Sequence, residues 1–388
     1  MFILLSERGP IYMRKRLFNR KFIPIVLCLM LVMTGIAGCS NTEKASKTDS
    51  EPEVTTLTIT DMAGRDVVVP KEIKKIFSAV PIGTVMLYTI NPDLLAAKNF
   101  KLSELEKKYT TEAYHNLPVL GTYIMGDTAN EEDILKLAPD VIIYAGFIDD
   151  SWKAKVDEAQ KRLEIPVIMV DGDLKGAPAA YEFLGKLLGE EEKAQKLSKY
   201  CQNTLTEAEK IASQIPEEKR LRMYYASGED GLMTYAAGNL HAELIDIVGG
   251  KNFADAKLGS PYQNTRLSAE QLIKWNPQII VANKVEARGG EGGAASLRAR
   301  ILGNSALNNL DAVKNGQVYE IPCAPFSWFG QPPSVARILG IKWLGNLTYP
   351  DQFKYDIEKE TKEFYKTFYS YDLSDKDFAE LTSNALRK

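Results

Sequence analysis

Side chains that could perform covalent chemistry are scarce in this sequence. Only two histidines, His115 and His241, occur in 388 residues, which argues against a metal site built from several imidazoles. The four cysteines form no C-x-x-C pair, as a zinc ribbon or thioredoxin-like centre would require. No Gly-x-Ser-x-Gly elbow or His-Glu-x-x-His helix is present, and the glycine-rich run at 289–293 lacks the Lys-Ser/Thr of a phosphate-binding loop. We therefore expect a binding protein. A secreted hydrolase is the alternative, which turnover of simple esters would reveal.

Binding chemistry is better represented, in loops that follow the predicted strand ends. Ligands of α/β folds lie at such loops, and aromatic faces suit a large planar or macrocyclic metal chelate. For each aromatic, plain core packing is the alternative. The candidate ligand-binding residues are Tyr123, Met125, Tyr144, Phe147, Tyr235, Asn239, His241, Tyr262, Asn264, Phe326 and Trp328.

Three groups in these loops have a more specific prediction. His241, at an expected helix start, is a candidate axial ligand of haem iron; a polar cleft or helix-start role is the alternative. Lys284 and Arg288 are candidates to hold ligand carboxylates, with a solvated loop as the alternative. Trp328 is predicted to stack on the ligand, and a core role stays open because tryptophan is mostly buried.

Short apolar runs predict the scaffold that positions these loops. Strands are expected at 76–80, 167–170, 222–226 and 318–321, and helical patterns alternate with them. This alternation indicates an α/β fold with mainly parallel sheets and helices on both faces. Alternating residues in 56–70 predict an opening hairpin.

Two stretches of the chain repeat each other. EDILKLAPDVII at 132–143 and EQLIKWNPQIIV at 270–281 share Glu, Lys and Pro at the same offsets, 138 residues apart. Each reads as a short amphipathic helix ended by proline and then a buried strand. The repeat predicts two similar α/β lobes with a ligand cleft between them.

A helical pattern without Pro or Gly runs from Glu190 to Ile215 and predicts one long helix joining the lobes. An ordinary surface helix within one domain is the alternative. The expected organisation is a signal peptide at 1–38, a flexible tether at 39–54, an N-terminal lobe at 55–188, the connecting helix at 189–215 and a C-terminal lobe with terminal helices at 216–388.

The N-terminal segment has the order of a secretory signal. A basic stretch at 14–21 precedes an apolar run at 22–33 and then Ile36-Ala37-Gly38-Cys39. Cleavage before Cys39 and acylation of its thiol would tether the protein to the membrane outside the cytoplasm, whereas an uncleaved anchor is the alternative. The pattern leaves open Met1 or Met13 as the start, and the inner or outer membrane. The net charge of −3 gives no general attraction for nucleic acid.

In this order the features resemble the substrate-binding lipoproteins of ABC importers for iron–siderophores, haem and vitamin B12. The residues that carry the resemblance are DMAGR at 61–65, VVVP at 67–70, the two repeats, AELIDIVGGKN at 242–252 and PFSWF at 325–329. The resemblance implies a monomer with limited hinge motion and no intrinsic cofactor. It also implies a ferric siderophore-like ligand, with haem or a corrinoid as the alternative, and an ABC permease dimer with its ATPase as partner.

The same family docks one glutamate of each lobe onto permease arginines, and these map onto Glu132 and Glu270. Equivalent helix starts on two lobes would present the carboxylates symmetrically, where the helix dipole favours them. The alternative is that each glutamate serves only its own helix start.

Overall fold

The computed structural model describes residues 55–126, 128–254, 264–283 and 296–387, which belong to one compact unit. Several predictions fall outside these residues: the signal peptide, the tether, Cys39, Tyr262, Lys284 and Arg288. None of the helices in the described ranges combines the length and the hydropathy that a membrane span requires.

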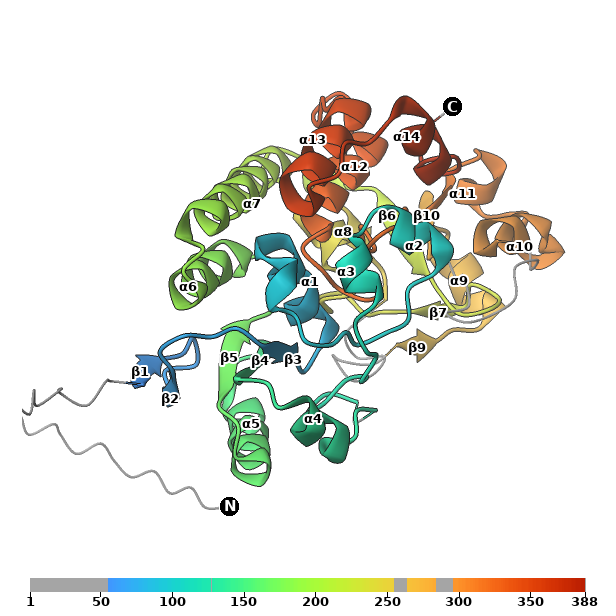
Figure 1. The fold of residues 1–388 in the computed structure, drawn as a ribbon. Coiled ribbons are helices and arrows are strands. Elements are labelled where there is room, and N and C mark those ends of the chain that lie inside the picture. The colour runs from blue at the N-terminus through green and yellow to red at the C-terminus, as the bar shows by residue number, and fades with distance from the viewer. Residues whose placement is uncertain (1–54, 127, 255–263, 284–295, 388) are drawn as a thin grey trace, which may run out of the picture. The chain divides into compact units, whose positions relative to one another are not determined.

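Strands and helices alternate along the chain (Figure 1), as the sequence pattern predicted. The strands are β1 (Thr56–Thr60), β2 (Asp66–Pro70), β3 (Ile76–Ser78), β4 (Val141–Gly146), β5 (Val167–Asp171), β6 (Arg222–Ala226), β7 (Met233–Thr234), β8 (Lys251–Asn252), β9 (Thr265–Arg266), β10 (Ile279–Ala282) and β11 (Val318–Glu320). The helices are α1 (Pro81–Ile90), α2 (Glu104–Lys108), α3 (Glu112–His115), α4 (Glu131–Leu137), α5 (Asp150–Leu163), α6 (Ala177–Leu188), α7 (Glu191–Ala212), α8 (Glu243–Ile247), α9 (Ala269–Trp275), α10 (Leu297–Gly303), α11 (Asp311–Lys314), α12 (Arg337–Thr348), α13 (Ile357–Tyr369) and α14 (Asp375–Leu381).

Two parallel sheets form the scaffold. The first sheet has the order β3-β4-β5, and the second sheet has the order β11-β10-β6-β8, with parallel pairing throughout both. All residues of β4 and β10 are buried, which is typical of parallel strands covered by helices on both faces. The structure therefore confirms the α/β class and the predicted strands.

The predicted hairpin is also confirmed, because β1 pairs with β2 in antiparallel register. Its turn is built around the buried carboxylate of Asp61, which accepts hydrogen bonds from the backbone amides of Ala63 (3.0 Å) and Arg65 (2.9 Å). Gly64 supplies the left-handed conformation of the turn, with φ of +76°. The same carboxylate accepts from the Met169 amide of β5 at 3.0 Å, so the turn fixes the hairpin to the first sheet.

The repeat predicted from sequence has a matching backbone. Helices α4 and α9 have seven residues each and end at left-handed residues, Ala138 (φ 46°, ψ 62°) and Asn276 (φ 44°, ψ 68°). Such backbone angles are uncommon outside glycine, so their recurrence at the same offset is informative. Pro139 and Pro277 follow directly, and β4 and β10 come next. The helix–proline–strand unit therefore occurs twice, once beside each sheet.

Helix α7 has 22 residues, about 33 Å at 1.5 Å per residue, and confirms the predicted long helix. It follows the strands of the first sheet in sequence and precedes those of the second. Figure 1 shows α6 running alongside it. The two helices approach closely at Gly185, where an added Cβ would lie 2.4 Å from the Cβ of Ala194.

The C-terminal helices contact the part of the chain that carries the first sheet. Lys108 at the end of α2 forms ion pairs with Asp377 (2.6 Å) and Glu380 (2.9 Å) on α14. Beside it, the ring of Tyr109 meets that of Tyr365 on α13 edge to face, with centroids 5.6 Å apart. Helices α13 and α14 therefore pack against the region around α2.

Candidate functional site

The loop after β5 and the segment that leads into α8 meet around Arg337, the first residue of α12. Its guanidinium is buried and donates to the carbonyl oxygen of Leu240 at 3.1 Å. It also approaches the carbonyl of Gly172, in the loop after β5, at 3.5 Å. An ion pair with Glu243 of α8 completes its surroundings. Arg337 therefore links the loop that follows the first sheet to the segment that leads into α8.

In this ion pair, burial disfavours both charges and the attraction between the two side chains favours them. Burial lowers the pKa of Arg337, and the Glu243 carboxylate opposes that change. Burial likewise raises the pKa of Glu243, and the Arg337 charge opposes it. The nearby Asp173 disfavours a second negative charge at Glu243. The position of Arg337 is thus fixed by hydrogen bonds and by one close anionic partner.

His241 lies beside this pair with its ring stacked on Tyr235, the two centroids being 4.3 Å apart at an interplanar angle of 21°. Its Nδ1 contacts the carbonyl oxygen of Gly330, which can only accept, so Nδ1 carries the proton. Burial, together with the charge of Arg337, lowers the pKa of His241 to about 4. At neutral pH the ring is therefore uncharged, and Nε2 has its lone pair. A backbone carbonyl on the other ring nitrogen is the usual support of a metal-ligating histidine.

Amide side chains extend the site across the ends of the second sheet. Asn283, after β10, donates from Nδ2 to Oε1 of Gln331 at 2.7 Å. Gln331, in the loop after β11, donates from Nε2 to the hydroxyl of Tyr235 at 2.5 Å. The backbone carbonyl of Tyr235 accepts from Nδ2 of Asn252 at 3.0 Å. We refer to Tyr235, His241, Asn283 and Gln331 as the polar–aromatic cluster.

Asn239 belongs to the same region. Its side-chain oxygen accepts from the His241 amide at 2.8 Å, and it is 2% exposed. Three sequence-predicted residues, Tyr235, Asn239 and His241, are therefore brought together. The sequence analysis did not select Asn283, Gln331, Glu243 or Arg337. The one available signal for Gln331 was its place between Gly330 and a Pro-Pro pair in the loop after a predicted strand.

Two predicted aromatics lie in other surroundings, in the part of the chain that carries the first sheet. The Tyr123 hydroxyl donates to Glu131 of α4 at 2.6 Å and accepts from Arg162 of α5 at 2.8 Å. Tyr144, in β4, is fully buried and stacks on Trp152 with centroids 5.7 Å apart. These contacts support a structural role, the alternative stated above for each aromatic, over contact with a ligand.

Three other predicted residues have the following places. The Phe147 ring lies 6.4 Å from that of Trp152, and Met125 is partly buried. Asn264 is exposed and directly precedes Thr265 of β9, which pairs with Thr234 of β7.

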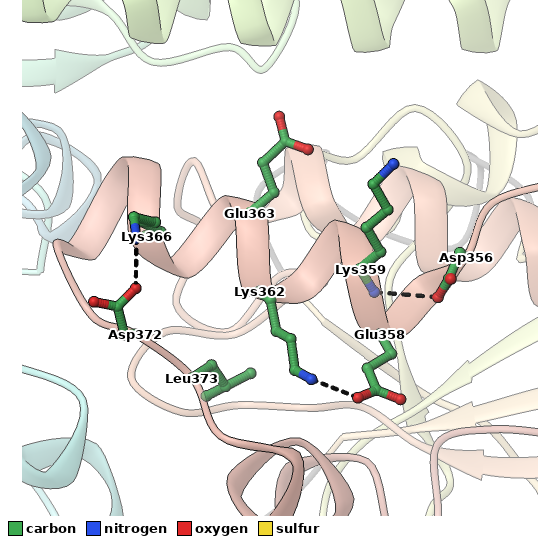
Figure 2. A pocket seen from close by; sticks show the side chains of 8 residues that line it. All are labelled: Asp356, Glu358, Lys359, Lys362, Glu363, Lys366, Asp372 and Leu373. Atoms are coloured by element: carbon green, nitrogen blue, oxygen red, sulfur yellow. Dashed lines mark hydrogen bonds and ion pairs between the residues drawn. The ribbon is translucent and has the colours of Figure 1, made fainter.

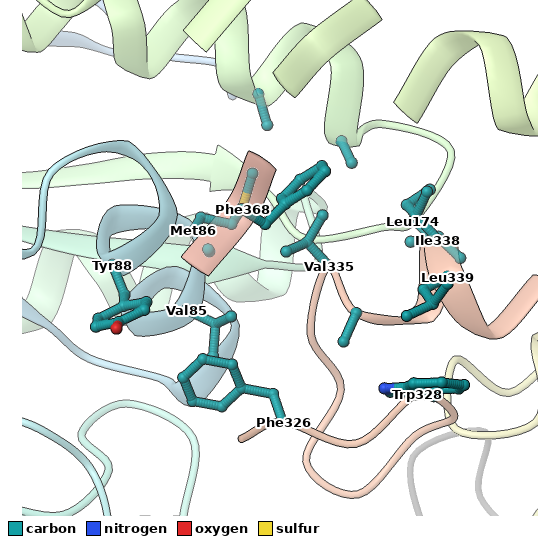
Figure 3. Close-up of a cluster of buried hydrophobic side chains, with 14 of the residues drawn as sticks. Val85, Met86, Tyr88, Leu174, Phe326, Trp328, Val335, Ile338, Leu339 and Phe368 are labelled. Atoms are coloured by element: carbon teal, nitrogen blue, oxygen red, sulfur yellow. The ribbon is translucent and has the colours of Figure 1, made fainter. Parts of the chain in front are cut away.

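Phe326 and Trp328 lie in the core, which corrects the expectation that they line the cleft (Figure 3). Phe326 is 2% exposed, with its ring 5.8 Å from that of Tyr88, and Trp328 is fully buried against Trp343. The cause is the close approach of α12 to this loop: an added Cβ at Gly340 would lie 1.7 Å from the carbonyl oxygen of Trp328. The loop after β11 therefore packs against α12 at Trp328 before it reaches Gln331.

Glu132 and Glu270 are both exposed at the second position of α4 and α9. The helix starts are capped by other side chains. Asn130 accepts from the Glu132 amide at 2.9 Å, and Ser268 accepts from the Gln271 amide at 3.1 Å. Hydrogen bonds from its own backbone amide and from the Ser268 hydroxyl lower the pKa of Glu270. Both glutamates have equivalent placement, as the repeat predicted.

A surface hollow of about 580 Å³ runs along α13, away from this site (Figure 2). Leu373 is the one apolar residue among those that line it. Its charges pair with one another: Lys362 with Glu358 at 2.6 Å and Lys366 with Asp372 at 2.9 Å. Such a surface is typical of a solvated helix face and lacks the apolar lining of a ligand pocket. No cluster of three or more His, Cys, Asp or Glu side chains suited to a metal ion occurs among the described residues.

Comparisons with known proteins agree with this architecture. The family model described as "Periplasmic binding protein" matches residues 88–325, which is more than half of the chain. An uncharacterized ABC transporter substrate-binding lipoprotein, YvrC of Bacillus subtilis, is 25% identical over 354 residues, covering 86% of this chain and 99% of the relative. The iron(3+)-hydroxamate-binding protein FhuD of the same organism is 22% identical, covering 79% of this chain and 91% of its own. The structure of an ABC transporter solute binding protein from Sulfurospirillum deleyianum superimposes with a TM-score of 0.75 at 28% identity, covering 84% of this chain and 99% of the other.

Proposed function

The chain belongs to the periplasmic binding protein family and is the substrate-binding protein of an ABC transporter, and from that premise we propose that its substrate is a metal chelate of the ferric siderophore type. The observation that carries the proposal is the polar–aromatic cluster, in which the aromatic face of Tyr235 lies beside the amide of Gln331 and the ring of His241. The relative FhuD is named for binding an iron(3+)-hydroxamate, which agrees with this class of substrate.

The chemistry of the polar–aromatic cluster favours a chelated metal over a free ion. A free divalent or ferric ion needs several anionic or imidazole ligands from the protein, and no such group occurs in the described ranges. A chelate brings most of its own donors. It then needs aromatic faces, amide groups and at most one ligand from the protein, which Tyr235, Asn283, Gln331 and His241 provide.

Haem or a corrinoid is the second candidate, favoured by the same histidine. Both are planar complexes whose metal takes an axial ligand, and a neutral imidazole with Nδ1 on a backbone carbonyl is suited to bind through Nε2. Compared with an iron chelate of hydroxamates, such a ligand depends more on His241 and less on the amides.

We further propose that residues 55–188 and 216–388 act as two lobes joined by the helix segment 189–215, with the ligand between them. The meeting of Gly172 and Leu240 at the Arg337 guanidinium supports this arrangement. Glu132 and Glu270 would dock onto arginines of a permease dimer with its ATPase. Acylated Cys39 would hold the monomer at the outer side of the cytoplasmic membrane or at the cell surface. We propose no nucleic-acid partner for the protein. Met125, Phe147, Tyr262 and Asn264 remain proposed ligand contacts.

The test starts from protein purified from its native host, whose absorption spectrum distinguishes haem, corrinoids and ferric siderophores. Titration of the stripped protein with a ferric trihydroxamate, haem and cyanocobalamin, followed by tryptophan fluorescence, then ranks the ligands. Tyr235→Ala should weaken the preferred chelate about tenfold or more. Tyr371→Ala, near α14, is the matched control. A colourless protein that binds none of the three chelates would overturn the proposal.

A further inference from the structure

Helices α4 and α9 each expose one large apolar side chain. Leu135 is 49% exposed and Ile273 is 42% exposed, and few large apolar residues of the described chain are as exposed as these two. The two residues are 138 positions apart, which is the offset of the repeat, so they occupy the same position in the two helices. A single exposed apolar residue is normal, and here the exposure recurs at equivalent positions of the repeat.

These side chains contribute little to the cores of their own helices. The neighbouring residues Ile134 and Leu272 already fill the core-facing position and are 0% and 1% exposed. On the solvent side of a short amphipathic helix a polar residue is the ordinary choice, as Lys136 is at the next position of α4. The exposure of Leu135 and Ile273 is therefore not a consequence of packing.

Each apolar side chain is close to a carboxylate on its own helix. Leu135 is three residues after Glu132, and Ile273 is three residues after Glu270, a spacing that brings side chains together on a helix surface. Two arginines close by in the chain or structure pair with other carboxylates, Arg162 with Glu131 and Arg266 with Asp230. Each helix thus presents one exposed carboxylate beside one apolar group.

We propose that Leu135 and Ile273 are a matched pair of apolar docking contacts, which insert into equivalent sockets beside basic residues on the two halves of a permease dimer. This rests on the proposed docking of Glu132 and Glu270. Two equivalent contacts on one chain suit a partner with two equivalent halves. A second copy of this chain is a poorer occupant, because it would bring like charges of the same helices together.

The experiment uses the full-length protein and the host's own permease–ATPase complex, reconstituted in nanodiscs. The double variant Leu135→Ala/Ile273→Ala should keep its melting temperature and its affinity for a ferric trihydroxamate. Its affinity for the complex should fall about tenfold or more. The loss of affinity should persist at a salt concentration of about 0.5 M, because salt does not screen apolar contacts. Val68→Ala, which is 58% exposed on β2, is the matched control and should bind normally.

The variant Glu132→Ala/Glu270→Ala separates this inference from the one on which it rests. If that variant weakens docking while Leu135→Ala/Ile273→Ala binds as the wild type does, the apolar contacts are refuted and the docking proposal stands. If the wild-type protein itself does not bind the complex, the proposed function fails. Equal loss in Val68→Ala, or a change from dimer to monomer in sedimentation of the Leu135→Ala/Ile273→Ala variant, would also overturn the inference.

Discussion

Arg337 on α12 and Glu243 on α8 form an ion pair in which only 1% of the arginine side chain and 20% of the glutamate side chain are exposed. Both residues lie where the loop after β5 meets the segment leading into α8. Removing one charge from such a pair leaves the other buried without a partner, and this cost exceeds what the intact pair contributes.

We therefore predict that Arg337→Met lowers the free energy of unfolding by about 3–5 kcal/mol in urea denaturation. Adding Glu243→Leu should recover most of that loss, because two apolar side chains leave no buried charge. Lys366→Met, which breaks an exposed pair with Asp372, should have almost no effect. If the double variant is no more stable than Arg337→Met, the pair is not the cause of the loss.

The pKa of His241, lowered to about 4 by burial, predicts a dependence of stability on pH. A histidine with a depressed pKa stabilises the folded state above its unfolded pKa near 6.5, and that contribution is lost as the pH falls through about 4. His241→Gln should remove up to about 3 kcal/mol of the change in unfolding free energy between those limits. His115→Gln is the matched control. An unchanged pH profile in His241→Gln would show that the ring is not held neutral.

Trp328→Ala should lower the unfolding free energy by about 3–5 kcal/mol, because the side chain is fully buried against Trp343. The affinity of the folded fraction for a ferric chelate should stay the same. Urea denaturation and fluorescence titration measure the two quantities separately. Weaker binding at unchanged stability would instead restore the stacking role expected from the sequence.

Glu132→Ala/Glu270→Ala should retain its affinity for the chelate and lose uptake in cells whose own copy is deleted. Exposed ion pairs contribute little alone, whereas pairs desolvated in an interface count for several kcal/mol when one partner is removed. Lys136→Ala/Lys274→Ala, on the same helices, is the matched control and should support uptake. Loss of chelate binding in the glutamate variant would assign these residues to the ligand site.

Cys39→Ser should release the protein from the membrane or leave the precursor unprocessed, since no thiol remains to carry the lipid. Membrane fractionation and the mass of the product distinguish these results. Ser40→Ala should remain anchored. Retention of a processed Cys39→Ser protein at the membrane would contradict acylation.

The fold could be predicted from the sequence where apolar runs and helix-ending residues such as proline indicate the same element. Buried runs gave β4 and β10, and the prolines after Ala138 and Asn276 marked where each repeated helix ends. The C-terminal contacts of Lys108 with α14 could not be read in this way, because they join surfaces that have no shared pattern in sequence.

The site was harder to predict because strand-end position does not determine which way a loop residue faces. Trp328 and Gln331 are in the same loop, yet one is beneath α12 and the other bonds Tyr235. Sequence reasoning favoured the larger aromatic, whose apolar surface is also what a core selects. Arg337 was missed because a basic residue at a helix start reads as solvated until its buried partners are known.

The ion pair between Lys108 and Glu380 joins residues 272 positions apart and has a consequence for how the chain acquires its structure. The region around α2 cannot complete its tertiary contacts until residue Glu380 has been synthesised and is free to pack. Contacts of such long sequence separation slow folding, because the closure entropy of a long loop must be overcome first.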